Sequence, residues 1–307
     1  MGPTLRVIDQ RATQMIGLAD YVWHDLEGSV CFKTRVIPVV VDEHGERTPI
    51  IERWAARVHD LQLVLHPAHY LPDPLRPEPS YIVLCEVRDT QGYPVESNIR
   101  AKLRKDLDRE GHRLGLWWGF RQDYTIEPHN KARDIQIHER HLRSCVDAGL
   151  MIHSARINST CRQFQIGPRG LPKEIDDEPT ALVVADHAWI ARYLLLRLAQ
   201  EDGRRINHPI GTECSVFFST ADMREHPAGV EIATKALDQN DRFYTTRLSA
   251  ANQRDTHIEM VEVANSDPYQ IIHCILTILC GGGNGQESGD SRRVDFGRKD
   301  NPDPRAG

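Results

Sequence analysis

The chain has 307 residues, of which 40% are hydrophobic and 27% are charged, which predicts a globular protein with one large or two ordinary cores. The formal net charge is −6, and lysine and arginine are scattered, so we expect no nucleic-acid partner. No apolar run reaches the ~20 residues needed to span a bilayer, so we expect no membrane partner either.

The seven cysteines form no C-x-x-C pair and lie mostly in apolar segments. Their odd number favours buried, reduced thiols over a disulfide framework. The N-terminus also lacks the charged-then-apolar pattern of a secretion signal. Together these features predict a cytoplasmic protein.

Strands dominate the predicted structure of the first third of the chain. Residues 1–18 are predicted to form a short amphipathic helix, and the proline-rich segment 67–79 an ordered loop. Runs of β-branched and aromatic residues predict four strands, at 21–25, 30–37, 61–65 and 81–87. Residues 19–95 are therefore predicted to form a small, mainly β domain.

Helices and strands alternate in the larger predicted domain, residues 96–280. Apolar residues at three- and four-residue spacing predict helices at 97–110, 134–148, 186–203, 220–238 and 267–280. Strands are predicted at 117–126, 151–157, 162–167 and 215–219. Residues 281–307 carry too few apolar residues to offset the entropy of ordering and are predicted to be disordered. The predicted fold class is α+β.

The strand at 117–126 contains the most informative segment, W-G-F-R-Q-D-Y-T. Alternate strand residues share a face, so Arg121 and Asp123 point the same way and can pair. The segment resembles G-x-E-Q-E-Y-T of glutamine synthetases, in which two glutamates hold divalent ions against ATP. Arg121 stands at the first glutamate position and Asp123 at the second. An arginine side chain offers no lone pair to a metal, so Arg121 cannot replace the glutamate as a metal ligand.

The resemblance to eukaryotic-type glutamine synthetases continues in the same order from about Tyr21 to Leu279. Scaffold motifs match at 21–25, 33–35, 84–87, 132–135, 164–168, 186–193, 218–220, 223–225 and 264–269. This resemblance implies a small β-grasp-like domain followed by a larger catalytic-type domain, in which an antiparallel sheet with flanking helices lines a funnel. It also implies assembly into an oligomer.

The segments that match the family's catalytic motifs depart from them. Thr160 and Gln163 stand at two glutamate ligand positions, Ser215 at a metal-contacting histidine, and Gln253 at a flap glutamate. The D-G-S-S segment that reaches the neighbouring subunit is absent after Trp54, and the segment that supplies phosphate-binding arginines is missing. The resemblance therefore implies that the Mg²⁺ or Mn²⁺ site is lost, and we assign no metal ligand and no cofactor.

Two hypotheses about function follow from these departures. In the first, the chain is a pseudoenzyme that acts by binding, as a homo-oligomer or in a complex with another enzyme. In the alternative, it is a diverged enzyme, an amide ligase or another catalyst for an amino-acid-like substrate. Its candidate pocket residues are Arg121, Asp123, Gln163, Glu213, Ser215 and Arg247.

Binding of ATP remains an open alternative in both hypotheses. The segments that match the family's nucleotide side supply Phe164, Gln165, Gly167, Phe218 and Ser219. His138 and His141 are spaced as metal ligands on one helix face, but the matching family helix has a histidine without a metal role. A structural role is therefore the favoured interpretation of both histidines.

Overall fold

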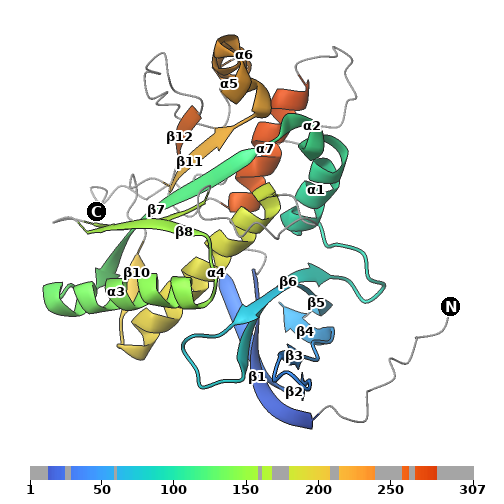
Figure 1. Ribbon diagram of the computed structural model, residues 1–307, viewed down its shortest axis with the longest axis vertical. Helices are drawn as coiled ribbons and strands as arrows, with labels where there is room; N and C mark the ends of the chain where they lie inside the picture. Colours follow the sequence, from blue (N-terminus) through green and yellow to red (C-terminus); the bar gives the residue numbers. More distant parts are fainter. Residues whose placement is uncertain are drawn as a thin grey trace, which may run out of the picture.

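The computed structural model describes residues 13–24, 29–58, 61–157, 161–167, 180–207, 214–238, 258–262 and 267–281. Two sheets and seven α-helices make up this part of the chain, which is the α+β class that the sequence predicts. Figure 1 shows the long helix α4 (Thr180–Glu201) running between the two sheets. No helix among the described residues has the length and apolar character to cross a membrane.

The first sheet contains six strands in the order β3-β2-β1-β6-β5-β4. They are β1 (Thr13–His24), β2 (Val30–Val41), β3 (Arg47–Pro49), β4 (Trp54–Val58), β5 (Leu61–Pro72) and β6 (Ser80–Arg88). The central pair β1/β6 is parallel and the other pairs are antiparallel. Trp54 of β4 lies edge-on to Tyr21 of β1 at 5.3 Å, and Lys33 of β2 lies over its ring at 4.3 Å. The sheet is therefore curled, because β1 and β4 are not neighbours in the strand order and yet their side chains are in contact.

Two predictions for this sheet were wrong. Residues 13–18, predicted as helix, belong to β1, because Met15, Gly17 and Ala19 alternate toward a buried face; residues 1–12 lie outside the described part. Residues 67–72, predicted as loop, continue β5. A register shift between Pro67 and His69 accommodates the proline, which has no N–H for the ladder. The predicted domain boundary at 95/96 lies between β6 and α1.

The second sheet has the order β12-β11-β7-β9-β8, and β10 pairs with β7. Its strands are β7 (Trp117–Glu127), β8 (Ile152–Ile157), β9 (Arg162–Ile166), β10 (Arg205–Asn207), β11 (Cys214–Ser219) and β12 (Ile258–Glu262). The predicted strands at 117–126, 151–157, 162–167 and 215–219 are confirmed to within one residue at each end. All of its pairs are antiparallel, as the resemblance implies.

The other helices are α1 (Ile99–Asp106), α2 (His112–Leu114), α3 (Lys131–Asp147), α5 (Ala221–Glu225), α6 (Pro227–Asp238) and α7 (Pro268–Gly281). A π-helical turn, Leu107–Gly111, follows α1. The predicted helix starts at 134 and 186 are late by three and six residues. At the start of α4 the run T-A-L-V-V-A is apolar on every side and gives no periodic signal. The predicted disordered tail lies outside the described residues beyond Gly281.

The larger core fills the space between α4 and both sheets, and a smaller core lies on the other face of the first sheet. Val22, Ile82 and Leu84 join the larger core, whereas Tyr21 and Val83 point into the smaller one. Because the middle of the first sheet is buried on both faces, every residue of β6 except Arg88 is buried.

Asp20 ties the first sheet to the C-terminal half of α4. This carboxylate is fully buried and accepts hydrogen bonds from Thr34 (2.7 Å), Arg76 (2.6 Å), Arg197 (2.7 Å) and Tyr193. Charge-assisted bonds offset the cost of removing a carboxylate from water.

Asp186 ties the N-terminal half of α4 to its neighbours. Its buried carboxylate accepts two bonds from Arg100 (2.8 and 2.7 Å) and one from Tyr269 (2.7 Å). Arg100 also donates to Glu86 of β6 at 2.7 Å. Burial alone would raise the pKa of Asp186, but the Arg100 guanidinium outweighs it and holds this pKa below its usual value.

Candidate functional site

The open face of the second sheet carries the residues that the sequence singles out. Along β7, Trp118, Phe120 and Tyr124 are buried toward the core, whereas Arg121 and Asp123 alternate with them and are partly exposed. The prediction that Arg121 and Asp123 share one face is confirmed by this alternation. The apolar residues of α4 share the larger core with Trp118, Phe120 and Tyr124, so this helix packs on the opposite face.

The strand register brings four of the six candidate pocket residues together. Arg121 lies directly opposite Ser215 of β11 on one side and Gln165 of β9 on the other. Asp123 lies opposite Gln163 of β9. Directly opposed residues have Cβ atoms roughly 5 Å apart and share a face. The remaining two candidates, Glu213 and Arg247, lie outside the described residues, as do Thr160 and Gln253.

Contacts from β11 hold the Arg121 guanidinium. Its Nη2 donates to the Ser215 hydroxyl at 2.8 Å, and its Cζ atom lies over the Phe217 ring, 4.9 Å from the ring centre. Ser215 is buried, so this contact is shielded from bulk water. A cation over an aromatic face and a hydrogen bond at one nitrogen orient the planar fork of an arginine.

Contacts from β9 hold the Asp123 carboxylate. The Gln163 amide donates to Oδ1 at 2.6 Å, and the Cys161 thiol lies 3.9 Å from Oδ2. An amide donates a hydrogen bond where a glutamate at the same position would offer a second carboxylate. Among the described residues, no three His, Cys, Asp or Glu side chains form a group that could hold a metal ion.

The residues matched to the nucleotide side fall on two faces. Gln165 lies beside Arg121, whereas Phe164 and Phe218 are fully buried, and Phe218 stacks on Trp118 at 5.1 Å. Phe164 and Phe218 therefore pack in the core below the candidate site. Ser219 lies opposite Trp117 at the end of β11, where its hydroxyl accepts a hydrogen bond from Arg224.

Gly167 directly follows β9, in a backbone conformation that favours glycine. Its φ is +58°, and a Cβ there would lie 2.6 Å from the Trp118 carbonyl oxygen. Replacing Gly167 by alanine should lower the free energy of unfolding by roughly 2 kcal/mol or more, from backbone strain and this clash. Gly203 is the matched control, because its φ is +68° with nothing within 4 Å, and its alanine variant should cost only about 1 kcal/mol. Urea unfolding measures both, and equal losses would contradict the role of the clash.

His138 and His141 have structural contacts. The Tyr124 hydroxyl and His138 Nδ1 are 2.7 Å apart, and His141 Nε2 lies 2.9 Å from the Ala191 carbonyl oxygen. Burial lowers the pKa of His141 to about 4, so the ring is neutral at pH 7. Both rings pack in the core, which supports the structural interpretation of the sequence.

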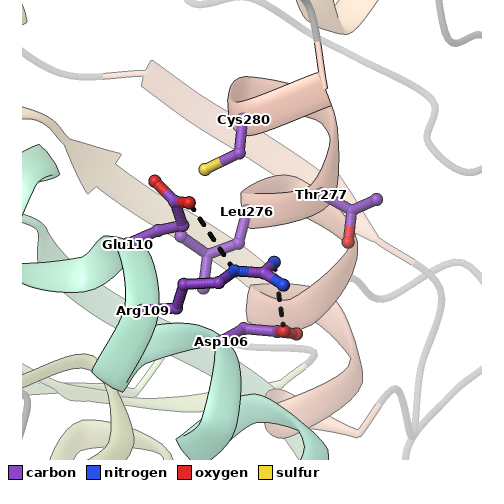
Figure 2. A pocket seen from close by; sticks show the side chains of 6 residues that line it. All are labelled: Asp106, Arg109, Glu110, Leu276, Thr277 and Cys280. Carbon is purple, nitrogen blue, oxygen red and sulfur yellow. Dashed lines mark ion pairs between the residues drawn. The ribbon is translucent and has the colours of Figure 1, made fainter. Parts of the chain in front are cut away.

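A separate pocket of about 240 Å³ lies between the π-helical turn and α7; it is lined by Asp106, Arg109, Glu110, Leu276, Thr277 and Cys280. Figure 2 shows Arg109 between Asp106 and Glu110, each 3.6 Å away. The arginine is two-thirds exposed, so these pairs are weak. A pocket with charges of both signs, already paired with each other, indicates no single class of ligand.

Two contacts of the site were missed from the sequence, Phe217 and Cys161. Phe217 could have been found by its alternation with Ser215, but its position under Arg121 depends on strand register. Cys161 directly precedes β9, and nothing in the sequence places its thiol beside Asp123.

No protein-family model matches the chain. Among curated proteins, it is similar to the glutamine synthetase of Eremothecium gossypii, with 29% identity over 278 residues that cover 76% of this chain and 69% of the relative. The glutamine synthetase of Agaricus bisporus is 28% identical over 72% of this chain and 70% of its own length. That of Kluyveromyces lactis is 28% identical over 76% and 69%, respectively.

Proposed function

Because this chain is related to the glutamine synthetases, we propose that it is a pseudoenzyme of that family which acts by binding rather than by glutamate–ammonia ligation. The proposal includes a β-grasp-like assignment for residues 19–95, a cytoplasmic location, and assembly as a homo-oligomer or with a partner enzyme.

The observation that carries the proposal is the position of Arg121. Its guanidinium occupies the centre of the sheet face, between Ser215 and Gln165, where the family's motif has a metal-binding glutamate. A fixed positive charge at this position opposes the approach of a divalent cation to the neighbouring Asp123 carboxylate. Metal-assisted phosphoryl transfer needs cations that bridge the phosphates, so this replacement removes what the reaction depends on.

Two short connections, one in the first sheet and one after β7, support the same proposal. β4 ends at Val58 and β5 begins at Leu61, so two residues stand where the family has the segment that reaches a neighbouring subunit. β7 ends at Glu127 and α3 begins at Lys131, so three residues replace a long loop over the nucleotide. Loops of this kind exclude water during catalysis, and their shortening leaves a site better suited to binding than to ligation.

A direct assay tests the proposal. Purified protein mixed with ATP, Mg²⁺, glutamate and ammonium should release phosphate no faster than the same mixture without glutamate. Glutamate-dependent release of phosphate, with formation of glutamine, would contradict the proposal. Light scattering after size-exclusion chromatography, with and without an active glutamine synthetase, would establish whether the chain assembles with itself or with the enzyme.

The alternative, a diverged enzyme, rests on the opposite charges of Arg121 and Asp123 on one face. A guanidinium fork binds carboxylate or phosphate in two-point contact, and a carboxylate can hold an ammonium group. The feature that separates the alternatives is turnover: a diverged enzyme would convert an amino-acid-like substrate and would lose this activity when Arg121 is replaced by glutamine. A binding protein would show no turnover before or after the change.

A further inference from the structure

One face of the first sheet extends beyond the part that α4 covers. Near the end of β1, Val22 joins the larger core and Asp20 accepts a hydrogen bond from Arg197 of α4. Because alternate strand residues share a face, Leu18 and Ile16 continue this face toward the start of β1. In Figure 1, the blue start of β1 lies at the bottom of the view, away from α4. The helix therefore leaves the first half of this strand face uncovered.

The uncovered half of the face is apolar on two paired strands. Ile16 is 74% exposed, and Leu18 is 36% exposed. On β2, Pro38 lies opposite Ile16 and Val36 lies opposite Leu18, so all four share the face. Val36 is 63% exposed, Pro38 is exposed, and Val40 continues the row half-buried. We call these five residues the β1/β2 patch, because contiguous exposed apolar side chains mark interaction surfaces.

The β1/β2 patch carries no charged side chain. Its uncharged neighbours on the same face are Gln14 of β1, Thr34 of β2 and Thr48 of β3. The next residue of this face along β1, Asp20, is fully buried and bonded to Arg76. Lys33 and Arg35 alternate with the patch residues and lie over the Trp54 ring, which packs on the smaller core of the other face. A partner recognised by charge, such as nucleic acid or an acidic peptide, therefore finds no complementary group on the patch.

A second copy of the chain meets the requirements of this surface. The chain has a formal net charge of −6, so two copies repel each other unless they meet through neutral surfaces. An apolar patch without charges is complementary to itself, and a two-fold axis brings the same patch of two copies together. Two sheet faces pack about 10 Å apart with their strands nearly aligned, and their side chains interdigitate.

We propose that the β1/β2 patch is a two-fold interface through which two copies of this chain pack sheet against sheet. This inference rests on the assembly named in the proposed function and specifies its surface. Five residues along each of two strands cover only about 17 Å by 10 Å. A standard stable interface buries about 800 Å² on each partner, so the dimer should be weak and should form only at high protein concentration.

Sedimentation equilibrium of the full chain tests the interface. The mean mass of the wild type should rise from that of one chain toward that of two as the concentration increases from about 1 µM to about 300 µM. A mass that stays at one chain would overturn the proposal. A mass well above two chains would also overturn it, because a two-fold interface closes at the dimer.

A matched pair of lysine variants shows whether the patch is the surface in contact. Val36→Lys places a charge in the patch, and Ile232→Lys places one on α6 at a residue that is also 63% exposed. Val36→Lys should weaken self-association at least about tenfold, because the dimer would bury a charge without a partner, and Ile232→Lys should change it less than about twofold. Equal effects of the two variants would overturn the proposal. Should Val36→Lys not fold, Ile16→Lys on the paired strand carries the same expectation.

Failure of this interface is distinguishable from failure of the proposed function. Self-association is read as mass without any substrate, whereas the proposed function fails on glutamate-dependent release of phosphate. If the wild type stayed monomeric alone but its mass rose with an active glutamine synthetase, the two-fold interface would be refuted. The proposed function would stand in that case, with the enzyme as the partner.

Discussion

Replacing Asp186 by asparagine should lower the free energy of unfolding by about 3–5 kcal/mol, the usual cost of leaving a buried charge without its partner. The asparagine keeps the shape of the side chain but removes the negative charge that faces the Nε and Nη2 donors of Arg100. Glu86 would remain as the second partner of Arg100 and keeps the loss at the lower end of that range. Urea unfolding at pH 7 measures it.

An exposed ion pair provides the control for this prediction. Asp147 pairs with Arg143 on the surface of α3 at 3.0 Å, with 41% of its side chain exposed. Its asparagine variant should change the free energy of unfolding by less than about 0.5 kcal/mol. Similar losses in the two variants would contradict the role of Asp186 as a buried ionic centre.

The pH dependence of this contribution has a definite sign. The folded-state pKa of Asp186 lies below its unfolded value, so the folded carboxylate releases its proton more readily. Its contribution is present above the unfolded pKa, near pH 3.9, and is lost as the pH falls through the folded value. The difference in stability between wild type and the Asp186→Asn variant should therefore shrink below about pH 4.

The sequence predicted those parts of the fold that have a clear periodicity. Alternation along 117–126 located β7, and the three- and four-residue spacing of apolar residues over 134–148 located α3. The errors fall where periodicity is absent or misleading. Met15 and Ile16 fit a helical spacing by chance, and the proline-rich start of the predicted loop entered β5 through a bulge. Local patterns cannot show such outcomes, because pairing with a neighbouring strand decides them.

For the candidate site, the sequence could predict which residues of one strand share a face, but not which residues of the neighbouring strands they contact. Alternation alone placed Arg121 and Asp123 on one face, but their partners Ser215 and Gln163 depend on strand register. The buried ionic centres were not predicted, because Asp186 and Arg100 are 86 residues apart in sequence. A charged residue in an apolar helix such as α4 is the signal that could have indicated a buried ion pair.

Replacing both Arg121 and Gln163 by glutamate should create a divalent-cation site on the open face of the second sheet. Glutamate at 163 would stand directly opposite Asp123, and glutamate at 121 would lie two residues along β7 on the same face. Three carboxylates within roughly 7 Å of one another offer the oxygen ligands that Mg²⁺ and Mn²⁺ prefer. We expect the variant to bind Mn²⁺ at least about tenfold more tightly than the wild type does.

The matched control changes the charge equally at a different place on the same sheet. Ser154 and Arg156 lie opposite Gln165 and Gln163 on the edge strand β8, two strands from Asp123. Their double glutamate variant alters the net charge by the same amount but leaves Arg121 in place. Titration followed by electron paramagnetic resonance of unbound Mn²⁺ should show binding at least tenfold weaker for this control and for the wild type. If the wild type bound Mn²⁺ as tightly as the Arg121→Glu, Gln163→Glu variant, the guanidinium of Arg121 would not exclude the metal. That result would contradict the proposed loss of the metal site.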